Sequence, residues 1–241
     1  MGKEIETLQK WIQDSCKVVF FGGAGVSTES GIPDFRSVDG LYHQEYDYPP
    51  ETILSHSFFM YHTDEFYRFY KKKMLCPEAK PNMAHKRLAQ WEAQGHVQAV
   101  ITQNIDGLHQ AAGSREVLEL HGSVLRNYCM KCHKSYDAEY MLHAEGVPTC
   151  TCGGTIKPDV VLYEEGLDDY TLRKSVEYIS QAEVLIIGGT SLVVYPAAGL
   201  IDYFRGKHLV VINKSVTSRD KNADLVIQDS IGKVFESIEI Q

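Results

Sequence analysis

Residues 18–27, VVFFGGAGVS, join four apolar side chains to a glycine-rich turn. A short apolar run that ends at glycines is typical of a buried strand in a parallel sheet, and glycines let the backbone approach a ligand closely. The pattern predicts a strand, a glycine turn and then a helix whose free N–H groups suit a phosphate. The turn could equally be a plain connection capped by Ser27 or Thr28, so it does not decide function alone.

Further short apolar runs follow along the chain, separated by segments with helical periodicity. The predicted strands are 97–101, 117–120, 185–187, 209–212 and 225–227. Apolar strands that alternate with helices predict an α/β fold, a Rossmann-like parallel sheet covered by helices on both faces. Ligands bind such sheets beyond the carboxyl ends of the strands, and these ends carry Gly, Thr, Gln, Asn, Ser and His here. This accumulation of small polar groups is the first sign of a binding site.

The overall composition disfavours some classes of function. The chain has 241 residues, a formal net charge of −8 and a pI near 5.7, and an acidic surface disfavours nucleic acid as a partner. Neither a signal-peptide core nor an apolar run of membrane-spanning length is present in the sequence, so we expect a cytoplasmic protein without a membrane partner. Six cysteines in such a protein favour metal binding or burial over disulfides.

The cysteines carry the strongest purely chemical signal. Cys129 and Cys132 are separated by two residues, and after 17 more residues come Cys150 and Cys152, separated by one. Two close thiol pairs can supply a closed tetrahedral zinc site, which leaves no open position for substrate and is therefore structural. The second pair is tighter than usual, so His133 stands as a substitute ligand.

Several motifs together form a family pattern, although each alone has an ordinary structural explanation, as His121 after a strand and Asp106 in a turn illustrate. The motifs are GAGVS (23–27), GIPDFR (31–36), TQNID (102–106), HG (121–122), the two cysteine pairs, GTS (189–191) and Asn213. In this order they resemble the sirtuin family, and the resemblance runs from about residue 15 to residue 231.

The resemblance implies two domains with NAD and an acyl-lysine between them. The Rossmann-like NAD-binding domain would comprise 1–36, 81–120 and 166–241, and the small domain a helical insertion (37–80) and a zinc-binding insertion (121–165). His121 would be the general base, and Asn104, Ile105 and Asp106 would form the nicotinamide pocket. The remaining implied NAD contacts are Ala24, Gly25, Thr28, Phe35, Arg36, Gln103, His121, Gly189, Thr190, Ser191, Asn213 and Ile231.

The implied activity is NAD-dependent removal of acyl groups, acetyl above all, from protein lysines, giving nicotinamide, O-acyl-ADP-ribose and free lysine. By the same resemblance the acyl-lysine peptide would bind as an added β-strand between two stretches, Glu165-Gly166-Leu167 and Val193-Val194-Tyr195. Two alternatives stay open. One is a protein mono-ADP-ribosyltransferase that uses the same pocket, and the other is a binding module, either a zinc-ribbon nucleic-acid binder or an NAD sensor without turnover.

Two departures from the family pattern concern specificity. The family often has Phe-Gly-Glu where this chain has Tyr163-Glu164-Glu165, which adds charge beside the expected peptide groove. Family members that remove acidic acyl groups carry Tyr-x-x-Arg, whereas the arginine position here is Tyr70. Arg68 lies two residues earlier and, on a helix, about 200° away. We therefore expect neutral acyl groups to be preferred.

Overall fold

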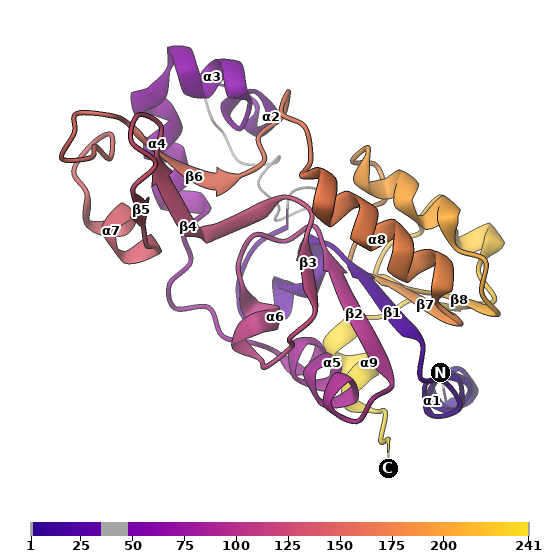
Figure 1. Cartoon of the computed structure of the whole chain (residues 1–241). Coiled ribbons are helices and arrows are strands. Elements are labelled where there is room, and N and C mark those ends of the chain that lie inside the picture. Colours follow the sequence, from indigo (N-terminus) through magenta and orange to yellow (C-terminus); the bar gives the residue numbers. More distant parts are fainter. Residues whose placement is uncertain (1, 35–47, 241) are drawn as a thin grey trace.

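The computed structural model describes residues 2–34 and 48–240 (Figure 1). The helices are α1 (Gly2–Gln13), α2 (Pro50–Ile53), α3 (His56–Tyr61), α4 (Thr63–Lys73), α5 (Met83–Ala93), α6 (Leu108–Ala111), α7 (Ala138–His143), α8 (Asp169–Gln181) and α9 (Ile231–Glu236). The strands are β1 (Val18–Gly22), β2 (Val97–Thr102), β3 (Val117–Glu119), β4 (Gly122–Cys129), β5 (Ser135–Tyr136), β6 (Ile156–Val160), β7 (Val184–Gly188), β8 (His208–Ile212) and β9 (Leu225–Ile227). Short 3₁₀ segments are η1 (Ala24–Val26), η2 (Thr28–Ser30), η4 (Ala197–Tyr203) and η5 (Asp220–Asn222).

A six-stranded parallel sheet with the order β3-β2-β1-β7-β8-β9 forms the larger part of the molecule. Every residue of β1 and of β7 is buried, because helices cover both faces and each side chain finds an apolar layer. Phe20 packs into the layer formed by α1, α5 and α9, whereas its neighbour Phe21 packs into the layer of α8 and η4. The predicted α/β fold class is confirmed.

A smaller antiparallel sheet, β5-β4-β6, lies at the other end of the molecule, beside α2, α3, α4 and α7 (Figure 1). Its apolar side chains, among them Ile156 and Val124, share one core cluster with the aromatic residues of α3 and α4. On α4, Phe66, Tyr67 and Tyr70 recur at helical spacing and so form one apolar face. Two segments that are far apart in the sequence therefore bury a common core.

The glycine turn after β1 differs from the prediction. The helix expected directly after this turn is wrong: the chain forms η1 and η2 instead. Gly25 N donates to Gly189 O at 2.8 Å, and a Cβ on Gly25 would lie only 2.8 Å from the Gly189 Cα. The loops after β1 and β7 thus pack backbone against backbone, which requires glycine and leaves no room for a regular helix start.

Within residues 2–34 and 48–240, none of the helices combines the length and the apolar character that crossing a membrane would require.

Candidate active site and metal centre

The carboxyl ends of β1, β2 and β7 are joined by the side chain and backbone of one residue, Gln103. Its N–H donates to Gly22 O at 3.0 Å, and its side-chain amide donates to Thr190 Oγ1 at 3.1 Å. Thr190 Oγ1 also accepts from Leu192 N, which fixes the loop after β7. The expected meeting of polar groups at this edge of the sheet is therefore present.

A buried hydrogen-bond chain runs beneath these loops. Asn104 Nδ2 donates to Ser27 Oγ at 3.0 Å, and Ser27 Oγ donates to Asp106 Oδ2 at 2.6 Å. The other carboxylate oxygen of Asp106 accepts from Leu108 N at 2.9 Å. Both oxygens are thus held in place, and the carboxylate keeps further lone pairs for a donor such as a carboxamide.

His121 stands at the junction of the two sheets, between the end of β3 and the start of β4. Its Nδ1 lies 3.0 Å from Gln103 O, and since a carbonyl only accepts, Nδ1 carries the proton and Nε2 keeps a lone pair. Burial lowers the pKa of His121, and the hydrogen bond to Gln103 opposes this shift in part. The imidazole is therefore neutral near pH 7 and able to accept a proton.

Two of the other residues expected near NAD make hydrogen bonds to backbone oxygens close in sequence. Thr28 Oγ1 donates to Gly25 O at 3.0 Å, and Asn213 Nδ2 donates to Ser215 O at 2.8 Å. Ser191 is exposed, whereas the side chain of Ile231 is 2% exposed and packs over Gly188. Ile231 can therefore offer a ligand mainly its backbone at the start of α9. Of the residues expected near NAD, Phe35 and Arg36 lie outside the described part of the chain.

The two stretches expected to hold a peptide are surface loops. Val193 is 53% and Tyr195 70% exposed. Glu165 N already donates to Leu162 O, and Val194 O already accepts from Ala198 N, so these two groups are engaged within the protein. A cavity of about 490 Å³ opens beside the first stretch. Its lining includes Glu165, Gly166, Leu167, Lys157, Tyr128 and Met130.

The four cysteines of the zinc prediction converge. Cys129 Sγ lies 3.4 Å from Cys152 Sγ, Cys132 Sγ lies 3.6 Å from Cys150 Sγ, and all four sulfurs lie within 4.8 Å of one another. Sulfurs bound tetrahedrally at about 2.3 Å from zinc are about 3.8 Å apart, so the set fits the ion. In the described residues this is the one group of potential ligands close enough to hold a metal, and His133 is not part of it.

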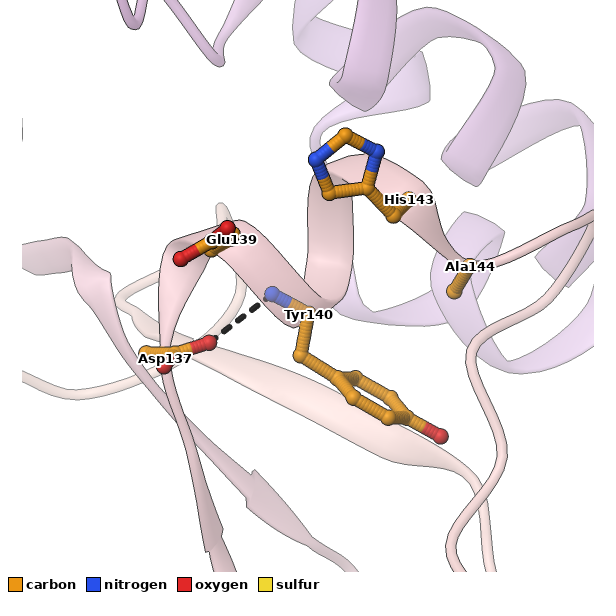
Figure 2. A pocket seen from close by; sticks show the side chains of 5 residues that line it. All are labelled: Asp137, Glu139, Tyr140, His143 and Ala144. Atoms are coloured by element: carbon orange, nitrogen blue, oxygen red, sulfur yellow. Dashed lines mark hydrogen bonds between the residues drawn. The ribbon is translucent and has the colours of Figure 1, made fainter.

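A second cavity, of about 400 Å³, lies along α7 in the same part of the molecule (Figure 2). Figure 2 shows Asp137, Glu139 and His143 spread along the helix rather than converging, and the Asp137 carboxylate accepts from Tyr140 N. The carboxylate thus caps the helix. We assign no chemistry to this cavity.

Three features of the site were missed by the sequence analysis. Ser27 was considered only as a helix cap, although its place at the end of the glycine turn could have indicated contact with the neighbouring strand end. His85 and His109 are 0% and 1% exposed, with ring centroids 4.6 Å apart, beside the Asp106 loop. Nothing in the spacing of these two histidines indicates that they pair, because they belong to different helices.

A parallel sheet with polar side chains gathered at its carboxyl ends, a partly buried neutral histidine and a closed four-cysteine centre define an α/β nucleotide-binding enzyme with a structural metal module. The chain belongs to the Sir2 family, whose model matches residues 23–196.

Curated relatives agree with this assignment. A protein of Clostridium acetobutylicum is 60% identical over 98% of both chains, and one of Clostridium perfringens is 60% identical over 99% of both. Each is named an NAD-dependent protein deacetylase.

Solved structures are similar over nearly the whole chain. A Sir2 protein with a p53 peptide and NAD+ is 40% identical, with a TM-score of 0.86, covering 96% of this chain and 95% of that one. Another, with a deacetylated p53 peptide and 3'-O-acetyl-ADP-ribose, is 39% identical with a TM-score of 0.88, covering 96% of each chain.

Proposed function

We propose that this protein is an NAD-dependent protein lysine deacetylase, which transfers the acyl group of an acyl-lysine to the ADP-ribose part of NAD and releases nicotinamide. The observation that carries the proposal is the position of His121: a partly buried imidazole with a fixed tautomer, bonded to Gln103 at the strand ends where the family signature converges. The names of the relatives support it. The acyl-lysine of a protein or peptide is the second substrate.

The residues at the strand ends are assigned to contacts with NAD. We assign the nicotinamide pocket to Asn104, Ile105 and Asp106, because the Asp106 carboxylate is oriented by Ser27 and can accept from a carboxamide N–H. The other NAD contacts are assigned to the loops after β1, β2, β7 and β8 and to the start of α9. They comprise Ala24, Gly25, Thr28, Phe35, Arg36, Gln103, Gly189, Thr190, Ser191, Asn213 and the backbone at Ile231.

His121 acts in this proposal as the general base. The acyl oxygen of the acyl-lysine would displace nicotinamide from the ribose. With Nδ1–H bound to Gln103 O, Nε2 of His121 could then accept the proton of a ribose hydroxyl, so that this hydroxyl attacks the carbon of the bound acyl group. Because burial lowers its pKa, the imidazole is already unprotonated at neutral pH. Water completes the transfer and frees the lysine.

The four-cysteine centre supports the fold and takes no part in the chemistry. Cys129, Cys132, Cys150 and Cys152 fill all four positions of a tetrahedral ion, so a bound zinc has no open site for substrate. We infer that the zinc-bearing segment 121–165 and the helical segment 37–80 form one small domain beside the NAD-binding domain of 1–36, 81–120 and 166–241. The shared core of their described residues supports this division.

The acyl-lysine peptide is proposed to pair as an added β-strand between 165–167 and 193–195, using backbone groups other than Glu165 N and Val194 O. Backbone pairing predicts low selectivity for peptide sequence. A net charge of −8 disfavours nucleic acid as a partner, so we expect none. We also propose a cytoplasmic location.

Mass spectrometry of the products tests the proposal. The protein, loaded with zinc, is incubated with NAD and one peptide carrying acetyl-lysine. We expect nicotinamide, O-acetyl-ADP-ribose and the free lysine peptide in equal amounts. Covalent ADP-ribose on the peptide or the protein, without O-acetyl-ADP-ribose, would instead establish a mono-ADP-ribosyltransferase.

A further inference from the structure

Residues 161–167 include the stretch that is proposed to pair with the peptide. This segment starts beside His121, the proposed general base. Val161 N donates to His121 O at 3.0 Å. Two residues later Tyr163 N donates to Leu54 O at 3.0 Å, and His56 N donates to Tyr163 O at 2.9 Å. The segment therefore runs from the junction of the sheets to the first turn of α3.

Glu164 has a backbone conformation that is unusual for its residue type. Its φ is 76°, in the left-handed region that glycine adopts without strain, and glycine is what the family often has at this position. Its carboxylate accepts from Ser57 N at 2.8 Å and from Ser57 Oγ at 2.5 Å. Ser57 N belongs to the first turn of α3, where backbone N–H groups lack a partner within the helix.

These bonds from Ser57 lower the pKa of Glu164, so its carboxylate stays charged. The added negative charge was expected to lie beside the groove. The carboxylate is turned toward α3, where the exposed N–H groups favour a charged acceptor.

Glu165 holds the same loop from the other side. Its Oε1 lies 2.8 Å from His56 Nδ1, and its Oε2 accepts from Leu162 N at 2.9 Å and from Lys157 Nζ at 3.2 Å. The ammonium of Lys157 is buried and also donates to Val160 O at 3.0 Å, which ties the carboxylate to the end of β6. The two neighbouring glutamates thus connect one loop to α3 and to the antiparallel sheet.

We propose that Glu164 and Glu165, with Ser57, His56 and Lys157, form a latch that holds residues 161–167 in the conformation that binds the acyl-lysine peptide. This inference rests on the proposed deacetylase function. A strand can pair with an incoming peptide at low entropic cost only if its own backbone is already ordered. Glu164 and Glu165 are therefore positioning residues for substrate binding, and the chain uses a strained glutamate to gain a bond to α3 that glycine cannot make.

Substitutions at Glu164 distinguish the effect of its backbone conformation from the effect of its carboxylate. Glu164→Gly accepts φ of 76° without strain, so the protein folds, but it loses both bonds to Ser57. We expect the KM for the acetyl peptide to rise roughly fivefold, a factor in the range of one ordinary hydrogen bond, because the bonds from Ser57 are exposed to solvent. We expect kcat and the KM for NAD to change by less than about twofold.

Two further variants complete the design. Glu164→Gln keeps one acceptor for Ser57 and should restore most of the peptide KM, a rescue that a purely structural role of the loop backbone would not produce. Glu177→Gln removes another exposed carboxylate, which pairs with Lys174 on α8, and it serves as the matched control with unchanged kinetics.

Amide hydrogen exchange tests the latch without relying on activity. In Glu164→Gly, exchange at Leu162, Tyr163 and Glu165 should accelerate at least about fivefold, while the amides of β1 stay unchanged. Unchanged exchange at these three amides would overturn the latch, whatever the kinetics. Faster exchange with an unchanged peptide KM would overturn its role in substrate binding. Failure of the wild-type protein to deacetylate any peptide would instead overturn the proposed function, and the exchange result would still decide whether the latch holds the loop.

Discussion

The two sheets of this protein are stabilised in different ways. In the parallel sheet, β1 and β7 are apolar throughout and are buried between two helical layers, so each residue added to a strand adds to one of two cores. The antiparallel sheet is short, and several of its side chains, such as Leu125 and Arg126 on β4, are exposed. Its core depends on aromatic residues from α3 and α4 and on four converging cysteines.

This difference shows which interactions stabilise each region. Burial of apolar area stabilises a large layered core without help, whereas a small sheet buries too little and needs a covalent or metal cross-link. The functional groups lie where the two regions meet, since His121 joins β3 of one sheet to β4 of the other.

Removal of the metal should have the largest effect, because it should destabilise the region of the antiparallel sheet and leave the parallel sheet intact. Zinc binding by four cysteine thiolates contributes on the order of 10 kcal/mol in small zinc modules. A chelator, or Cys129→Ser, should therefore unfold the region of β4, β5, β6 and α7 while the parallel sheet keeps its protection. Hydrogen exchange followed by mass spectrometry measures both regions at once. Elemental analysis that found no stoichiometric zinc in protein purified without chelators would contradict the assignment.

Loss of His121, the base between the two sheets, should lower the rate of the reaction without changing the stability of either region. We expect His121→Ala to lower kcat by roughly two to four orders of magnitude, the usual contribution of a general base, with a much smaller change in the Kd for NAD. In the wild type the rate should hold below pH 6.5 and fall only as pH drops through the lowered pKa of His121. His143→Ala, on α7 away from the site, is the control. A His121→Ala variant with near wild-type turnover would remove His121 from the mechanism.

Acid should destabilise the parallel-sheet region through the buried pair His85 and His109. Burial lowers the pKa of His85 to about 4, although Asp106 opposes the shift, and burial together with the neighbouring His85 lowers the pKa of His109 well below its usual value. Because both folded-state pKa values lie below the unfolded value near 6.5, stability is complete above pH 6.5 and is lost as pH falls below it.

Below pH 6.5 each histidine that stays neutral in the folded state should lower the free energy of unfolding by about 1.4 kcal/mol per pH unit, so the pair should lower it by roughly 4 kcal/mol between pH 6.5 and pH 5. Urea unfolding at pH 7, 6 and 5 measures this slope, and His109→Phe should reduce it by about half. An unchanged slope in that variant would mean that other groups control acid unfolding.

The smallest expected effect concerns acyl choice in the small region. Tyr70 is fully buried, and its hydroxyl has no hydrogen-bond partner among residues 2–34 and 48–240, whereas Arg68 on the same helix is exposed. A carboxylate buried there would lack a cationic partner, which is costly. Acetyl-lysine should therefore exceed succinyl-lysine by at least about tenfold in kcat/KM, or about 1.4 kcal/mol. Parallel kinetics on one peptide with each acyl group decides this, and equal desuccinylation would mean that a cation reaches the pocket.

Much of this protein follows from local sequence patterns. The apolar runs around Phe20 and Ile186 determine parallel strands, because only a sheet covered on both faces can bury every residue of such a run. The spacing of Cys129 and Cys132 and the pair that follows indicates a metal centre, because thiol pairs on two turns satisfy a tetrahedral ion almost independently of the surrounding fold.

Other features were decided only by tertiary structure. The loop after β1, whose Gly25 packs on Gly189, forms 3₁₀ turns instead of the expected helix, and the carboxylate of Glu164 accepts from Ser57. In each case a residue distant in sequence supplies the partner, so no local periodicity or propensity can reveal it. The sequence by itself determined which elements and which chemical groups this protein has. The packing of its distant segments decided which groups face one another, because hydrogen bonds and close contacts act over a few ångströms in space, whatever the separation along the chain.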